Sequence, residues 1–278
     1  MIKFKLSLIL VVFFSLSEFS FSQEADSIGK EEKAPVYDFL IVNGRYQSAF
    51  TFLGRDFGQT ISFGSLDLMY FFNSGVYFNI SSFKFLQTDV PLQYGLTLGY
   101  FKEISNTTDF NISYSQFIVN QSTGITGIEN LGFLQSTFGL DCGIMYSTVQ
   151  PQVLFNEKND YFLGSHHSRY FEIDQKLFKK ITVSFEPKFS ILAGTSRFYQ
   201  SGFDGLLETD QIENTDRFQL VSNEFTLPLT FASGGWEFEF QPRYVVPLNV
   251  PEFDSSANRF IWGFQFSYAV PVKKTKKQ

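Results

Sequence analysis

The sequence predicts an all-β fold, a transmembrane antiparallel up-and-down β-barrel of about twelve strands, with roughly ten to fourteen as the range. Three observations lead to this fold class. Apolar and polar residues alternate with a period of two along most of the chain. The connections between the alternating segments are short and long in turn. The first residues have the features of an export signal.

The composition suits strands with one apolar face. The chain has 278 residues, including 37 Phe and 13 Tyr, yet its mean hydropathy is −0.04, because polar residues are interleaved with the aromatic ones. The formal net charge of −6 argues against nucleic-acid binding driven by phosphate neutralisation. Cys142 is the single cysteine, which excludes an intrachain disulfide and a cysteine-based metal site.

The amino-terminal segment 1–22 is predicted to be a cleaved signal peptide. Lys3 and Lys5 form its positive region, and the apolar stretch that follows is too short to span a bilayer. Residues 23–35 are polar and charged and are expected to form a disordered periplasmic lead-in. The barrel is expected over 36–272, and a Lys-rich periplasmic tail over 273–278.

The period of two is sharpest in the second half of the chain. Ile181, Val183 and Phe185 alternate with Thr182 and Ser184, and a helix would need apolar spacings of three and four. Successive side chains of a strand point to opposite faces, so each such segment has one apolar and one polar face. The predicted strands are 43–53, 60–72, 75–85, 92–102, 109–119, 133–141, 145–155, 161–173, 181–193, 218–231, 236–248 and 259–272.

Loop lengths predict how these strands sit in a membrane. The even-numbered connections are tight or moderate, and the odd-numbered ones include the long polar segments 120–132, 195–217 and 250–258. Short turns on one side and long loops on the other are typical of outer-membrane barrels with both termini in the periplasm. Only helices and closed barrels satisfy their backbone groups in lipid, so an exported strand-rich chain is expected in the cell outer membrane as a closed barrel.

Prolines interrupt this pattern inside four predicted strands. Proline removes a donor from the hydrogen-bond ladder, and a closed barrel has no edge strand to accommodate it. Pro151, Pro187 and Pro242 lie at similar heights in three strands, and Pro228 lies in a fourth. We therefore expect a ring of β-bulges at the height of the first three prolines.

Several short segments resemble a known protein type. A leader that ends in Ser22-Gln23, the segment 54–58 (GRDFG) and the strand cores 150–152 (QPQ) and 241–243 (QPR) resemble the outer-membrane β-barrel proteins of Bacteroidota. The last strand, 263–268 (GFQFSY), resembles their barrel-assembly signal, but Ile261 stands where that signal usually has a polar residue, and a Lys-rich tail follows it. The resemblance implies a Gram-negative outer-membrane barrel; the family is functionally heterogeneous and implies no catalytic or binding residue.

Charged residues on the polar faces are the candidate lumen-lining residues. They are Asp67, Lys84, Glu186, Lys188, Glu224, Glu237, Glu239 and Arg243. One interpretation is an ion-paired lumen that fills a narrow barrel. The other is a net-acidic conduit, because rings of acidic side chains favour cations.

The cluster His166-His167-Ser168 is the one arrangement that suggests an enzyme. His166 and Ser168 are two apart, so they share a face of a strand, as in the His-x-Ser arrangement of some barrel lipid hydrolases. An Asn often follows that Ser, whereas this chain has Arg169, and the sequence supplies no third member. We assign no catalytic residue, no metal site and no cofactor.

The predicted function is a passive porin or small-solute channel, and the protein is not expected to be an enzyme. One alternative is a closed structural or assembly-partner barrel, and another is an outer-membrane lipid hydrolase. The expected partners are outer-membrane lipid, the barrel-assembly machinery during biogenesis, and surface proteins that the long loops contact; nucleic acid is not expected. The segment 195–217 would plug the barrel if folded inward and bind partners if folded outward.

Overall fold

The computed structural model describes residues 37–118, 130–202 and 209–273. The predicted signal peptide and lead-in lie outside these residues, as does the tail beyond Lys273. Part of the segment between the predicted fifth and sixth strands also lies outside them. None of the helices in the described ranges is long and apolar enough to cross a membrane.

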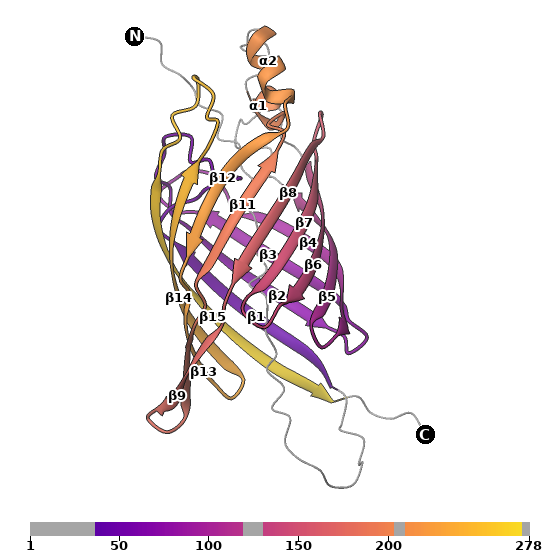
Figure 1. Ribbon diagram of the computed structural model, residues 1–278, viewed down its shortest axis with the longest axis vertical. Coiled ribbons are helices and arrows are strands. Elements are labelled where there is room, and N and C mark those ends of the chain that lie inside the picture. Colours follow the sequence, from indigo (N-terminus) through magenta and orange to yellow (C-terminus); the bar gives the residue numbers. More distant parts are fainter. Residues whose placement is uncertain (1–36, 119–129, 203–208, 274–278) are drawn as a thin grey trace.

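The chain forms a closed antiparallel β-barrel of twelve strands (Figure 1). The first seven strands are β1 (Tyr37–Gln47), β2 (Phe63–Phe71), β3 (Val76–Phe85), β4 (Gln93–Ser105), β5 (Thr108–Ile118), β6 (Asn130–Asp141) and β7 (Tyr146–Phe155). Three further wall strands are each split into two segments: β8 (Asp160–Ser168) with β9 (Phe171–Leu177), β10 (Ile181–Phe185) with β11 (Lys188–Gly194), and β12 (Gln219–Thr226) with β13 (Leu229–Ser233). The last two are β14 (Trp236–Pro247) and β15 (Arg259–Lys273).

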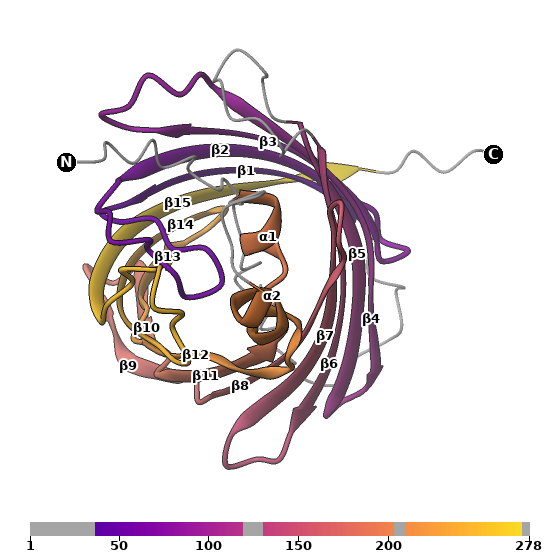
Figure 2. The same ribbon diagram turned by 90° about the horizontal axis from the view of Figure 1, so that it is seen from above.

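Pairing between the first and last strands closes the barrel. β1 pairs with β15 from Tyr37↔Lys273 to Gln47↔Gly263 and with β2 on its other side. Viewed from above, the strands form a continuous ring (Figure 2), and α1 (Phe198–Gly202) and α2 (Thr209–Asp216) lie at one end of it (Figure 1). Because every wall strand has a partner on each side over most of its length, the barrel leaves few backbone groups unpaired in the membrane.

Two of the three split strands are interrupted at a proline, which removes a hydrogen-bond donor from the wall. Pro187 separates β10 from β11, and Pro228 separates β12 from β13, whereas β14 runs unbroken through Pro242. The register is the same on both sides of each gap and on both sides of Pro151 in β7, so the predicted ring of bulges is wrong. Proline deletes a ladder donor without adding a residue, which interrupts pairing but does not shift it. Register shifts lie elsewhere, as between Glu103 and Ser105.

The alternation of loop lengths is confirmed. At the end where β1 begins and β15 ends, the neighbouring strands are joined by short turns at 72–75, 106–107, 142–145, 178–180 and 234–235. The long connections 48–62 and 248–258 lie at the opposite end, as do residues 195–202 and 209–218 with α1 and α2 (Figure 1).

The first strand differs most from its prediction. It spans Tyr37–Gln47 rather than 43–53, because the chain leaves the wall after Gln47. The alternation that predicted a strand through Phe52 is real, but Phe50 and Phe52 are buried inside the barrel end instead of facing lipid. Period-two patterning identifies an apolar face and does not say against what that face packs.

The outer face is an apolar belt. Large apolar side chains alternate outward along the strands, for example Leu96 and Leu98 on β4 and Phe264 and Phe266 on β15. In water such a surface would drive aggregation; in a bilayer it faces acyl chains.

We predict that Leu98→Arg lowers the free energy of unfolding by about 2–4 kcal/mol, the range for a cation near the bilayer midplane. Leu98 lies in the middle of β4 and its side chain is 58% exposed on the outer face. Ile104→Arg is the control, since Ile104 is 62% exposed near the end of the same strand, where the cost is about 0–1 kcal/mol. Urea titration of the barrel folded in vesicles measures both, and equal costs would contradict this placement of the belt.

Candidate functional site

Seven of the eight predicted lumen residues point inward. Asp67 on β2 pairs with Asn43 and Ser81, away from the exposed Leu66 and Leu68. On the other side of the barrel, Glu224, Glu237, Glu239 and Arg243 alternate with outward apolar residues on β12 and β14, and Glu186 and Lys188 flank Pro187. Arg45 on β1, which the sequence analysis did not select, joins them.

These side chains form one electrostatic cluster, which we call the lumen cluster: Arg45, Asp67, Glu186, Lys188, Glu224, Glu237, Glu239 and Arg243. Glu239 interacts electrostatically with Glu237, Glu186, Lys188 and Arg45, although these residues come from β14, β1 and the β10–β11 strand. Five members are acidic and three are basic, so the cluster is net negative. A net-negative lining favours cations over anions.

Specific contacts hold the basic members against the wall. Arg45 donates from Nε and Nη2 to Gln265 Oε1 at 3.0 and 2.7 Å. Arg243 donates from Nη2 to Gln47 Oε1 at 3.1 Å, and its Nη1 lies 3.6 Å from Glu224 Oε2. Both guanidinium groups are therefore held by neighbours on the wall, while Glu239 keeps one buried oxygen without a hydrogen-bond partner among the described residues.

Lys84 does not belong to the lumen, which corrects its predicted position. On β3 the inward residues are Tyr77, Asn79, Ser81, Phe83 and Phe85, all buried. Lys84 has the opposite phase and donates from Nζ to Val90 O at 2.5 Å near the end of the strand. The error arose because the inward face of β3 becomes aromatic toward this end, so polarity alone assigned the wrong face.

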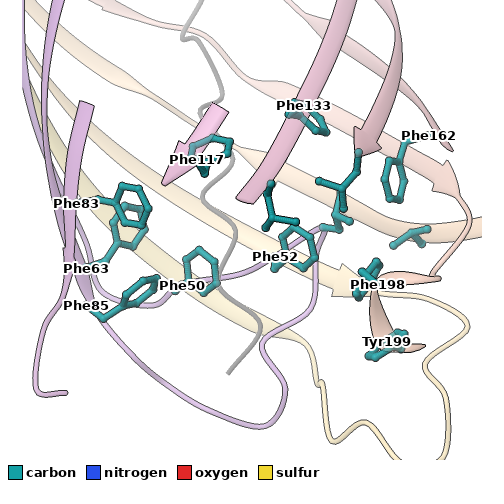
Figure 3. Packing of buried hydrophobic residues seen from close by; sticks show 14 residues of the cluster. Phe50, Phe52, Phe63, Phe83, Phe85, Phe117, Phe133, Phe162, Phe198 and Tyr199 are labelled. Carbon is teal, nitrogen blue, oxygen red and sulfur yellow. The ribbon is translucent and has the colours of Figure 1, made fainter. Parts of the chain in front are cut away.

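An apolar plug fills part of the barrel interior at the end that carries the long loops. We use the term plug for residues 48–62, 195–202 and 248–258. Their aromatic side chains pack against inward residues of the wall in one buried cluster (Figure 3). From the wall come Phe63, Phe83, Phe85, Phe117, Leu131, Phe133, Leu154, Phe162 and Val221, and from the plug come Phe50, Phe52, Leu53, Phe198 and Tyr199.

Aromatic rings within this cluster meet in edge-to-face contacts. Phe52 and Phe198 are 0% and 1% exposed, and their ring centroids lie 4.9 Å apart at 75°. Phe50 meets Phe85 at 5.0 Å and 90°. Such aromatic pairs contribute about 0.5–1.5 kcal/mol each beyond the area that they bury. The plug is therefore packed like a protein core and is not a loop lying over an opening.

A tight turn brings the first plug segment to this position. Phe52 and Arg55 form a β-bridge around Leu53 and Gly54, whose φ values are 51° and 76°. A Cβ on Gly54 would lie 2.3 Å from the Ser222 side chain, so both the backbone conformation and the close approach require glycine. The 54–58 segment that carried the family resemblance thus has a structural role in this chain.

Polar contacts fasten the three plug segments together. Tyr199 donates its hydroxyl hydrogen to Asp254 Oδ2 at 2.5 Å. The Ser256 hydroxyl binds the Asp254 carboxylate and accepts from the backbone N–H of Asp56 and Phe57. Arg259 donates from Nε to Asp56 Oδ2 at 2.7 Å, and its Nη2 also contacts that oxygen. These hydrogen bonds therefore join the loop after β1, α1 and the loop before β15 to one another.

Arg55 joins the loop after β1 to the start of the loop before β15. Its side chain is 1% exposed and donates from Nη2 to Leu248 O at 2.5 Å. Burial lowers the pKa of Arg55, while nearby Tyr199 and Asp254 act in the opposite direction. Burial also raises the pKa of Tyr199 well above its ordinary value, which keeps the phenol neutral as the donor to Asp254.

The His-x-Ser pair shares a face, as predicted from its spacing, and that face is the lumen. His167 lies on the opposite face with Ser147 and Ser165. The described hydrogen bonds of His166 go to Ser190 and Gln150, and none of them goes to Ser168. No group of three or more His, Cys, Asp or Glu side chains in the described ranges could hold a metal ion.

Comparison with solved structures identifies the architecture. LpxR from Salmonella typhimurium is 9% identical, with 82% of this chain and 99% of that chain covered and a TM-score of 0.51. A NanC porin is 8% identical, with 82% and 98% covered and a TM-score of 0.50. The fold is that of the outer-membrane β-barrels. An outer membrane channel from Pseudomonas putida F1 is 10% identical over 88% and 100% of the two chains, at a TM-score of 0.46.

At these identities the likeness is one of fold alone. No family model matches the chain. No curated protein matches it either. Function therefore has to be argued from the lumen cluster and the plug.

Proposed function

We propose that this protein is an outer-membrane channel for small polar solutes, with a preference for cations, whose resting state is closed by the plug. The observation that carries the proposal is the lumen cluster: ionisable side chains from five wall strands facing one interior. A barrel that served only as a scaffold could fill that space with apolar residues, as this chain does at its plugged end.

The plug adds a closed state to the passive channel expected from the sequence. Its aromatic cluster occupies the barrel end that carries the long loops, where the interior would otherwise open (Figure 3). Solutes would pass when the plug segments move aside. The chain carries these segments on long connections anchored to the wall at both ends, so they can be displaced without breaking the barrel.

Conductance in a planar bilayer tests the proposal. The mature chain is refolded in detergent, and a gel-mobility shift between boiled and unboiled samples first shows that the barrel has formed. We expect rare openings with a cation-selective reversal potential in a salt gradient. Anion-selective current would contradict the assigned role of the lumen cluster.

A folded barrel that shows no current would favour the alternative function, a closed structural barrel, which the tightly packed plug also supports. The two functions separate when the plug is loosened by mutation. A channel then conducts, and a scaffold with a filled lumen does not. In the second case, surface proteins that bind the long loops become the proposed partners.

A further inference from the structure

Three hydrogen-bonded side chains on neighbouring strands form a relay along the inner face of the wall, next to the plug. The imidazole of His166 lies between two side chains from the neighbouring wall strands. Ser190 Oγ on β11 is 2.7 Å from His166 Nδ1, and Gln150 Oε1 on β7 is 3.0 Å from His166 Nε2. All three side chains are half-buried on the lumen side and so remain accessible from it.

The partners determine where the protons lie. An amide oxygen can only accept, so His166 Nε2 carries the proton that it donates to Gln150 Oε1. Nδ1 is then the unprotonated nitrogen, and the Ser190 hydroxyl donates to it. A serine hydroxyl bound to the basic nitrogen of an imidazole whose other nitrogen is held by an acceptor is the arrangement that activates a nucleophile.

The third member is itself held in place. Gln152 Nε2 donates to Gln150 Oε1 at 2.7 Å, and Gln150 Nε2 donates to Thr137 Oγ1 at 3.1 Å. These bonds require that the oxygen of Gln150 faces the imidazole. Gly164 lies between the two partners, and a Cβ there would come within 3.4 Å of both Gln150 Oε1 and His166 Nε2.

The surroundings suit an ester with an apolar acyl group. Two residues beyond Ser190 on the same face, Leu192 packs against the buried aromatic cluster, and Phe162 of that cluster lies on the His166 strand. On the other side, Lys188 lies two residues from Ser190 and interacts electrostatically with His166. An acyl chain would lie against Leu192 and Phe162, with the positive charge of Lys188 near the imidazole.

We propose that Ser190, His166 and Gln150 form a catalytic triad that hydrolyses acyl esters entering the lumen. Ser190 Oγ attacks the ester carbonyl carbon as its proton passes to His166 Nδ1. The carbon–oxygen bond to the alcohol breaks, and the alcohol leaves with that proton. Water then attacks the acyl-serine with His166 again as base, which releases the carboxylic acid and restores Ser190.

The first test is covalent labelling of the folded wild-type barrel. A fluorophosphonate probe reacts with activated serines, and mass spectrometry locates the labelled residue. We expect the label on Ser190. A folded barrel that takes up no probe there, or takes it up on Ser168 instead, overturns the proposal. This readout is independent of conductance, so it is separate from the success or failure of the channel hypothesis.

Hydrolysis of p-nitrophenyl butyrate supplies the second test. Ser190→Ala and His166→Gln are expected to lower turnover by about 100-fold or more, the usual contribution of an activated nucleophile and its base. Ser168→Ala is the matched control, because this serine also faces the lumen next to His166 but is not bonded to it, and it should retain full activity. Unchanged turnover in both variants would contradict the triad.

Gln150 is the positioning residue, and its conservative variant separates catalysis from structure. A carboxylate at this position would stabilise the imidazolium that forms during the reaction better than an amide does. Gln150→Glu is therefore expected to raise turnover by about tenfold, while Gln150→Ala lowers it. A purely structural glutamine would give no gain on replacement by glutamate.

Discussion

Replacing Phe52 and Phe198 together by alanine is expected to convert a rarely conducting barrel into an open channel. The two rings contact each other at the centre of the plug, one from the loop after β1 and the other from α1. Each Phe→Ala change in a packed core costs about 3–5 kcal/mol. Because the wall strands pair independently of the plug, we expect this cost to appear as plug release and not as loss of the barrel.

Single-channel recording with the gel-mobility shift measures both consequences. The double variant should keep the shift on boiling and show long-lived openings at voltages where the wild type is closed. Phe260→Ala is the control, since Phe260 is a large aromatic residue near the same end of β15 whose side chain is 61% exposed. An intact double variant without added current would mean that the plug does not close the conduction path.

Breaking the polar network gives a second route to the same state. Asp56→Ala leaves Arg259 without the carboxylate that it binds, which removes one contact between the loop after β1 and the loop before β15. The backbone hydrogen bonds of residues 56 and 57 to the Ser256 hydroxyl remain. We expect openings more frequent than in the wild type and fewer than in the double phenylalanine variant, because the aromatic cluster remains. Removing one partner of a fully buried ion pair costs about 3–5 kcal/mol of stability. We expect a smaller loss for Asp56→Ala, because the Arg259 side chain is partly exposed.

Neutralising Glu237 and Glu239 is the change with the largest expected effect on selectivity. Replacing both by Gln removes two of the five acidic charges of the lumen cluster while keeping side-chain size and hydrogen-bonding capacity. The cluster then carries as many positive as negative charges, and the ratio of cation to anion permeability should fall toward unity. Reversal potentials in a KCl gradient measure this ratio.

Lys84→Gln provides the matched control for selectivity. It also neutralises one charge, but Lys84 lies on the outer face of β3, so the permeability ratio should stay at the wild-type value. The plug-released background makes the current large enough to compare the variants. A shift of similar size per charge at Lys84, toward higher cation permeability because a positive charge is removed, would show that surface charge, and not the lumen, sets the selectivity.

The sequence by itself determined the fold class, the order of the strands and the side on which the long loops lie. These features depend on local signals. The side-chain period of two assigns a face to each residue, as for Glu237 and Phe238, and short turns such as 142–145 identify the end at which neighbouring strands meet. The prolines predicted where the hydrogen-bond ladder is interrupted, but they did not predict that the strand register would be the same on both sides of each interruption.

Only the tertiary structure decided what the inward faces do. The alternation at Phe50 and Phe52 matches a lipid-facing strand, yet these rings pack inside the barrel against Phe85 and Phe198. Lys84 falls on the outer face because the inward face of β3 is aromatic at that end. The relay of Ser190, His166 and Gln150 joins residues that are 16 to 24 positions apart. Periodicity records that a side chain is apolar or polar, whereas its partners depend on strand register and barrel closure, which bring distant segments to one height.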